Sequence, residues 1–179
     1  GWRLPGAAFA RAGAAFETRV KGGLQNAILT ATGLLVVPHR TSVAQTTVAR
    51  IVFQRGWNLD EDVQFFADGD HGLRGYRLYA FEGDRRFIFN LEHRIFGGFE
   101  VLQLFTLGAA VFVDSGTAVP EGAPLRFSAF KTDAGAGLRI GIARAARSNV
   151  LRLDYAYAFD ADPRGKRGWL VSFSSGQAF

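Results

Sequence analysis

The sequence contains no cysteine, so a disulfide framework and a thiolate metal site are both excluded. It also contains no methionine, and we therefore expect the 179 residues to be a processed or excised part of a longer translation product. No apolar run approaches the ~20 residues that a membrane-spanning helix needs. The longest runs, Gly33 to Val37 and Leu107 to Val113, are far shorter, which excludes a helical membrane protein.

The formal net charge of +5 comes mostly from arginines spread along the chain, which argues against a nucleic-acid partner. The three histidines, His39, His71 and His93, are separated in the sequence and accompany no nucleophile elbow or phosphate loop. We therefore expect no enzyme activity and no cofactor. Asp68, Asp70 and His71 could form part of a metal site, but three ligands on one loop without a fourth are weak, and we expect no metal.

Large apolar residues alternate with small, polar or charged residues along most of the chain, which indicates β-strands. Between Asn149 and Phe159, for example, the odd positions are aliphatic or aromatic, whereas Arg152 and Asp154 lie between them. The pattern predicts an all-β chain with eight strands. Their approximate bounds are 5–20, 23–37, 43–57, 85–96, 100–115, 131–145, 149–160 and 168–179.

A water-soluble sandwich would show the same alternation with its apolar face inside. Three features favour the inverse arrangement, in which apolar residues face lipid and small or polar residues face a lumen. The strands exceed the soluble mode of about 5–6 residues, their aromatic residues lie near strand ends as in interfacial girdles, and the opposite face is small or polar. We therefore predict one transmembrane antiparallel β-barrel domain over residues 1–179.

Loop lengths predict the orientation of this barrel. The short connections at 38–42, 97–99 and 146–148 alternate with longer ones at 58–84, 116–130 and 161–167. In membrane barrels short turns face the periplasm and long loops face the outside. The short turn at 21–22 is the exception, since it is expected on the outer side.

Five motifs occur in a distinctive order. They are Leu73-Arg74-Gly75-Tyr76, Asn90-Leu91-Glu92-His93-Arg94, Val111-Phe112-Val113-Asp114-Ser115-Gly116, Gly135-Ala136-Gly137-Leu138-Arg139 and Leu151-Arg152-Leu153-Asp154-Tyr155-Ala156. With these motifs, residues 50–179 resemble the carboxy-terminal half of the BamA/TamA superfamily of outer-membrane assembly and secretion barrels, which includes the FhaC-related pores.

In that family the arginine loop folds back into the lumen and docks on acidic groups of the wall. The resemblance implies that Arg74 pairs with Glu92 and Asp114. The residues agree with this, because both carboxylates fall on the polar face of neighbouring predicted strands. A planar guanidinium can meet two carboxylates with directed hydrogen bonds. Gly72 and Gly75 allow the loop backbone to approach the wall.

The final predicted strand carries Trp169, Phe173 and Phe179 on one face, like the terminal signal of barrel substrates. Family members usually have about sixteen strands and periplasmic domains, whereas this sequence has room for eight strands and has no counterpart of those domains. An eight-stranded barrel has little interior space for the loop at 58–84, and open edges are not tolerated in lipid. We expect a homo-oligomer, most simply a dimer that completes a larger barrel, or a missing amino-terminal half.

The resemblance implies a bacterial outer-membrane protein, of the kind also called a bacterial surface antigen, that assists protein insertion or transport. Lateral opening at an edge-strand seam would template an incoming strand. The expected partners are outer-membrane lipid and client membrane proteins. Two alternatives stay open: a structural or pore-forming barrel without insertase activity, and a soluble β-domain.

Overall fold

The computed structural model describes residues 2–3, 8–20, 23–39, 41–101, 105–142 and 150–176. Its main sheet is antiparallel, in the order β1-β2-β3-β4-β7-β8-β9-β10-β11, and β5 and β6 form a second, two-stranded sheet. The strands are β1 (Trp2–Arg3), β2 (Phe9–Val20), β3 (Leu24–His39), β4 (Ala44–Trp57), β5 (Phe65–Ala67), β6 (Phe81–Gly83), β7 (Arg85–Val101), β8 (Phe105–Val119), β9 (Lys131–Ile142), β10 (Val150–Ala158) and β11 (Gly168–Ser175).

The prediction of an all-β chain is confirmed. Each of the eight predicted segments overlaps one long strand of the main sheet, but the two-residue β1 makes nine strands in that sheet. The strands β5 and β6 were not predicted, and they lie inside the connection at 58–84. Parts of the predicted strands, residues 5–7, 102–104, 143–145, 149 and 177–179, lie outside the described residues, as do the predicted turns at 21–22 and 146–148.

The predicted short connection at 97–99 is wrong, because β7 continues through these residues to Val101. The strand pairing resumes at Glu100 after a register shift that begins at Phe96, so an irregularity in the ladder replaces the expected turn. Strand β8 likewise extends beyond its predicted end at residue 115. Its last residues, Thr117 to Val119, are buried, and β8 contacts both β5 and β6.

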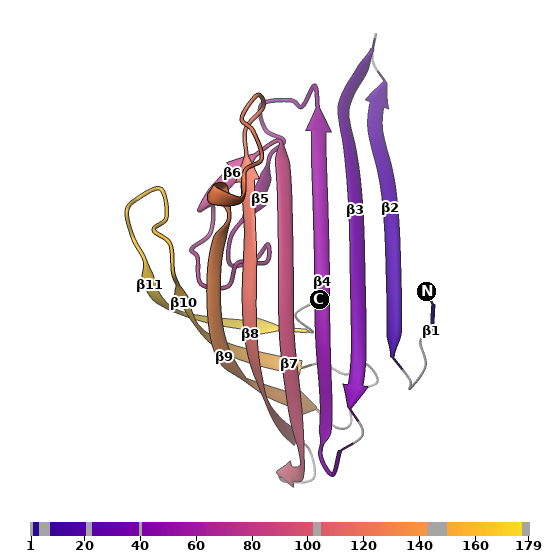
Figure 1. Ribbon diagram of the computed structural model, residues 1–179, viewed down its shortest axis with the longest axis vertical. Coiled ribbons are helices and arrows are strands. Elements are labelled where there is room, and N and C mark those ends of the chain that lie inside the picture. The colour runs from indigo at the N-terminus through magenta and orange to yellow at the C-terminus, as the bar shows by residue number, and fades with distance from the viewer. Residues whose placement is uncertain are drawn as a thin grey trace.

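The two faces of the sheet have opposite polarity, and the sheet curves so that β9, β10 and β11 turn away from the direction of β2 to β4 (Figure 1). On the convex face, large apolar side chains are exposed, as Val111 (57 %), Leu138 (56 %) and Phe173 (71 %) illustrate. On the concave face, charged side chains such as Glu92 and Asp114 are completely buried. This distribution is the reverse of that in a water-soluble sheet protein.

The strand register aligns the buried polar residues across the sheet. Asn90 of β7 lies opposite Asp114 of β8, and Asp114 lies opposite Asp133 of β9. A small apolar cluster lies next to this polar row and includes Val52, Ile88 and the loop residue Leu73. The concave face is therefore filled by the connection between β4 and β7, which supplies both apolar and charged contacts.

The sheet is open within the described residues. Strand β11 pairs only with β10 there, and β2 pairs only with β3 and, over two residues, with β1. The described residues therefore form a curved, open sheet. Closure of this sheet into the predicted barrel stays a prediction. No helix among the described residues is long and apolar enough to span a membrane.

The β2–β3 hairpin projects from one end of this sheet (Figure 1). From Arg11 to Val20 every side chain of β2 is exposed, on the concave face as well as on the convex face. The concave face of β2 carries Arg11 and Glu17, whereas the convex face carries alanines and Phe16. The two-sided pattern of the sheet therefore continues into β2, which the described residues leave exposed from Arg11 to Val20.

Candidate functional site

The connection between β4 and β7 folds into a compact turn around Asp68, which is completely buried. The carboxylate of Asp68 accepts hydrogen bonds from the backbone N–H groups of Asp70, His71 and Tyr79. The backbone carbonyl of Asp68 accepts a bond from the N–H of Leu73. These bonds fix the turn that precedes the arginine motif, so the motif enters the concave face in a defined conformation.

The guanidinium of Arg74 lies between two carboxylates of the sheet wall. Its Nε and Nη2 atoms donate to Asp114 at 2.7 and 2.9 Å, and its Nη1 donates to Glu92 at 2.5 Å. The guanidinium also stacks over the ring of Phe112, with its carbon 3.4 Å from the ring centroid. The structure therefore brings together Arg74 and the two wall residues that the sequence singles out, through a two-pronged pairing with Asp114.

Arginines of the wall itself share these carboxylates. Glu92 contacts Arg94 at 2.7 Å and Arg139 at 3.3 Å, in addition to Arg74. Arg139 continues to Asp154 at 2.5 Å, and Asp154 lies 3.8 Å from Arg74. Arg74 thus joins an ion-pair network that extends across β7, β8, β9 and β10, and buried charges of this kind are stabilised only when each has partners.

Charge and burial act in opposite directions on Arg74. Burial lowers the pKa of its guanidinium, but the hydrogen bonds and negative charges of Asp114 and Glu92 outweigh burial, and the pKa is raised. Arg74 is therefore a permanent cation in the docked loop. Its positive charge is the one that the loop contributes to this network, because the other arginines of the network belong to the sheet.

Gly75 and Tyr76 complete the docking. A Cβ atom at Gly75 would lie 2.6 Å from the Cβ of Asp133 and 3.2 Å from the backbone nitrogen of Ala158, so only glycine fits this approach. The hydroxyl of Tyr76 donates to the backbone carbonyl of Thr132 at 3.0 Å. Burial raises the pKa of the Tyr76 phenol. Gly72, with a φ of +108°, adopts the left-handed region that favours glycine.

Asn90 is a wall residue that the sequence analysis named only within a motif. Its side-chain amide donates to the backbone carbonyl of Gly72 at 2.7 Å and to Asp114 at 2.8 Å. Arg139 was likewise named only within a motif, and Asp154 was named within a motif and as a polar-face residue of its strand. The sequence feature that these three residues share is that each occupies the small or polar face of its strand. That feature alone does not predict which of their side chains form contacts.

The predicted terminal signal lies apart from this network. Trp169 and Phe173 project from the convex face of β11 and are 60 % and 71 % exposed. Phe179 lies outside the described residues. Within the described part of β11, these aromatic residues are therefore available to an apolar environment and do not contact the docked loop.

The histidines occupy three different environments. His71 contributes its Nδ1 to a 2.7 Å hydrogen bond with Asp68, so this pair belongs to the turn. His39 and His93 both contact the hydroxyl of Thr47, at 2.7 and 2.9 Å. Among the described residues, no cluster of three or more potential metal ligands occurs.

A scan of the sequence against protein-family models finds no match, and a search among curated proteins likewise finds none. The chemistry of the site therefore has to be read from its own geometry. That geometry holds a loop in place by charge, through the pairing of Arg74 with Asp114 and Glu92.

Proposed function

We propose that this chain is the membrane-embedded, carboxy-terminal half of an outer-membrane assembly or secretion barrel of the BamA/TamA type. It would assist the insertion or translocation of other proteins without covalent chemistry. The observation that carries the proposal is the docking of Arg74 on Asp114 and Glu92. This is the arrangement that the resemblance implies for the arginine loop.

Location in the bacterial outer membrane is part of the proposal. A convex face of exposed aliphatic and aromatic side chains needs an apolar surrounding, and the polar concave face suits a lumen. In lipid every backbone polar group needs a partner, which leaves closed barrels as the spanning form for strands. An open sheet with this polarity is therefore best explained as part of a larger barrel.

The incomplete perimeter supports association. Strand β2 continues the wall but has both of its faces exposed, and its concave side carries Arg11 and Glu17. We propose that a second copy, in a two-fold dimer, or an amino-terminal half covers this strand. Mass measurement of the protein in detergent should give a dimer, and a monomer alone would contradict the two-fold form of the proposal.

The proposed mechanism uses the two edges of the sheet, where β11 and most of β2 lack a second partner strand among the described residues. An unpaired edge presents backbone N–H and C=O groups that can pair with an incoming strand. A seam between such edges would open laterally and template a client strand. The docked loop would hold the wall in shape while the seam opens, because Arg74 ties the loop to strands β7 and β8, away from both edges.

Reconstitution tests the activity directly. The purified protein is placed in liposomes, and the rate at which an unfolded test barrel protein acquires protease resistance is compared with that in empty liposomes. Acceleration is expected for the unmodified chain, and Arg74→Ala should reduce it while Arg126→Ala, a change at an exposed loop residue, should not. Membrane integration without any acceleration would instead favour the structural or pore-forming alternative.

A further inference from the structure

A small chamber, which we call the arginine chamber, lies on the concave face between the docked loop, β4, β10 and β11. Its volume is about 120 Å³, which is space for a few water molecules or for one small anion. The residues that line it include three arginines, two serines and an asparagine: Arg50, Arg74, Arg152, Ser172, Ser174 and Asn90. Strands β4 and β11 are not neighbours in the sheet, so the curvature of the sheet brings both to this chamber.

The ion-pair network beside the chamber holds more cations than anions. Its four arginines share three carboxylates: Arg74, Arg94, Arg139 and Arg152 with Glu92, Asp114 and Asp154. Arg50 adds a cation at the chamber, and the buried Asp133, opposite Asp114 on β9, adds a carboxylate. One positive charge therefore remains in excess within this group, and buried charge is costly unless an opposite charge compensates it.

Two polar side chains of the chamber have unused hydrogen-bonding atoms. Arg152 donates from Nη2 to Asp154 at 2.7 Å, but its buried Nε has no hydrogen-bond partner among the described residues. Asn90 donates from Nδ2 to the carbonyl of Gly72 and to Asp114, whereas its buried Oδ1 has no partner in the same part of the chain. The chamber therefore offers an unused guanidinium N–H donor and an unused amide acceptor, next to two serine hydroxyls.

The acidic group nearest to this chamber does not compensate the excess from within. Asp70 is the one carboxylate among the described residues that line the chamber, and its residue is exposed. Its charge is therefore screened by solvent. The buried part of the lining consists of donors and cations together with the single acceptor of Asn90.

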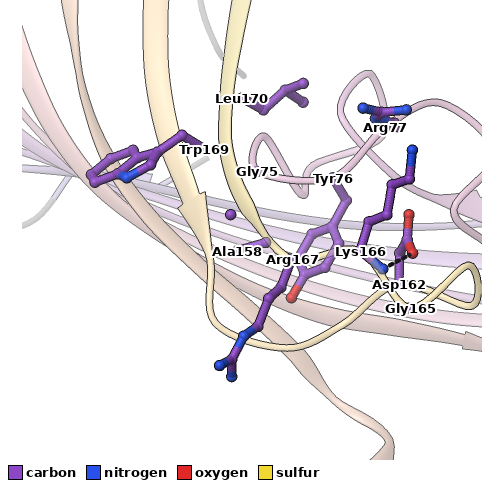
Figure 2. A pocket seen from close by; sticks show the side chains of 11 residues that line it. Gly75, Tyr76, Arg77, Ala158, Asp162, Gly165, Lys166, Arg167, Trp169 and Leu170 are labelled. Carbon is purple, nitrogen blue, oxygen red and sulfur yellow. Dashed lines mark hydrogen bonds between the residues drawn. The ribbon is translucent and has the colours of Figure 1, made fainter.

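A larger cavity, of about 390 Å³, lies between the residues after Arg74 and the connection from β10 to β11. It is also lined by cations, but Figure 2 shows Lys166 and Arg167 directed away from each other. Both residues are exposed. Cations that diverge into solvent do not converge on one anion, so the smaller arginine chamber is the better anion site.

We propose that the arginine chamber binds one phosphate-sized oxyanion, for which hydrogen phosphate is the best fit. Its oxygens would accept hydrogen bonds from Arg152 Nε and from the hydroxyls of Ser172 and Ser174, and charge-assisted bonds of this kind are strong. Its remaining proton would be donated to Asn90 Oδ1. The inference goes beyond the proposed function and requires neither the membrane location nor insertase activity.

The anion would also stabilise the docked loop. Gly69, Gly72 and Arg74 of the loop line the chamber, so releasing the loop dismantles the site. An anion that binds the docked state alone lowers the released population by a factor of one plus the ratio of its concentration to its Kd. Phosphate is therefore expected to act as a ligand of the docked conformation.

Trypsin cleavage of the full chain in detergent tests this coupling. The rate of cleavage after Arg77 follows the released population when opening is fast, so phosphate at ten times its Kd should slow it about elevenfold. Cleavage after the exposed Arg126 in the same samples should keep its rate, which controls for effects on the protease. Sodium chloride at matched ionic strength should give no protection, and equal protection by chloride would overturn the proposal.

Titration calorimetry of variants locates the anion. Arg152→Gln removes the unused donor while Asp154 keeps Arg139 at 2.5 Å, and it should weaken phosphate binding by about tenfold or more. Ser172→Ala with Ser174→Ala should weaken binding several-fold without removing a charge, and this pair keeps the test decisive if Arg152→Gln does not fold. Unchanged phosphate affinity in the folded variants would overturn the proposal.

Two matched controls accompany these variants. Ser175→Ala removes an exposed hydroxyl from the same strand, and Arg167→Gln removes an exposed cation of the larger cavity. Both should bind phosphate like the unmodified chain. A loss of affinity in Arg167→Gln as large as that in Arg152→Gln would show an effect of general surface charge and would overturn the assignment to the arginine chamber.

Other anions identify the ligand. Inorganic phosphate should bind more tightly than glycerol 3-phosphate, because the chamber has little room for the glycerol group. It should also bind more tightly than sulfate, which carries no proton for Asn90 at neutral pH. Tighter binding of glycerol 3-phosphate would assign the site to the phosphate group of a larger molecule, and equal binding of sulfate would overturn the assignment to hydrogen phosphate.

The outcomes distinguish this inference from the proposed function. A chain that binds phosphate but does not accelerate the insertion of a test barrel protein would contradict the proposed function alone. A chain that accelerates insertion but shows neither phosphate binding nor protection by phosphate would contradict the anion site alone.

Discussion

Replacement of Arg74 by alanine should release the loop between β4 and β7 from the concave face. The side chain donates three charge-assisted hydrogen bonds, two of them to Asp114. Without it, Glu92 keeps two arginine partners, whereas Asp114 keeps the neutral amide of Asn90. The uncompensated charge therefore falls mainly on Asp114. Removing one member of a buried ion pair costs about 3–5 kcal/mol.

This energy sets the expected size of the effect. At about 1.4 kcal/mol for each factor of ten, the docked state should lose roughly a hundredfold or more against the undocked state. Trypsin reports on this equilibrium, because Arg77 is the only remaining arginine or lysine between residues 58 and 84 in the variant. When opening is fast, the rate of cleavage follows the open population, so the fragment ending at Arg77 should appear much sooner.

Three further variants calibrate the result. Arg74→Lys keeps the charge but loses the planar fork, so its cleavage rate should be intermediate. Asp114→Asn added to Arg74→Ala removes the stranded charge and should restore part of the protection. Arg126→Ala should behave like the unmodified chain. Equal cleavage after Arg77 in the unmodified chain and in folded Arg74→Ala would refute the reasoning that Arg74 anchors the loop.

Two substitutions in the same loop, a change of pH and a removal of detergent give further expected outcomes. Gly75→Ala places a Cβ 2.6 Å from that of Asp133, so it should also accelerate cleavage after Arg77. An unchanged cleavage rate would show that Asp133 and its strand can shift to accommodate the added methyl group. Tyr76→Phe removes the bond to Thr132 and should cost about 1 kcal/mol of docking, measured as a several-fold faster cleavage. Because burial raises the pKa of Tyr76 above its ordinary value of about 10, the folded protein keeps a proton that the free phenol loses, and docking should weaken as pH rises above about 10. Near-ultraviolet absorbance should detect the late ionisation, and its persistence in Tyr76→Phe would assign it to another tyrosine. Dilution below the critical micelle concentration should aggregate the protein through its convex face, and a stable monodisperse solution would contradict the membrane location.

The alternation of residue types predicts much of this fold because side-chain direction in a strand has a period of two. The same rule assigns Glu92 and Asp114 to one face without any knowledge of the tertiary structure. It does not determine which residues on that face touch, since contact depends on register. Arg139 and Asp154 meet only because β9 and β10 pair with Arg139 opposite Arg152.

The interior of the connection at 58–84 was not predictable from periodicity. Strands β5 and β6 are three residues each, too short to establish an alternating pattern. Asp68 reads as an ordinary loop carboxylate, and its role as the centre of a turn depends on backbone N–H groups as distant as Tyr79. The glycine pair at 97–98 favours a turn in the sequence, but continued pairing with β8 keeps the residues beyond it in β7.

The exposure of β2 on both faces implies that stability is graded along the chain. Among the described residues, β2 lacks covering side chains on either face, whereas the strands around Arg74 are joined by buried charges and by the docked loop. Regions with few buried contacts open at the lowest free energy. Amide hydrogen exchange should therefore begin in β2 and reach β7 and β8 last, so that the isolated chain unravels from its amino-terminal side inward.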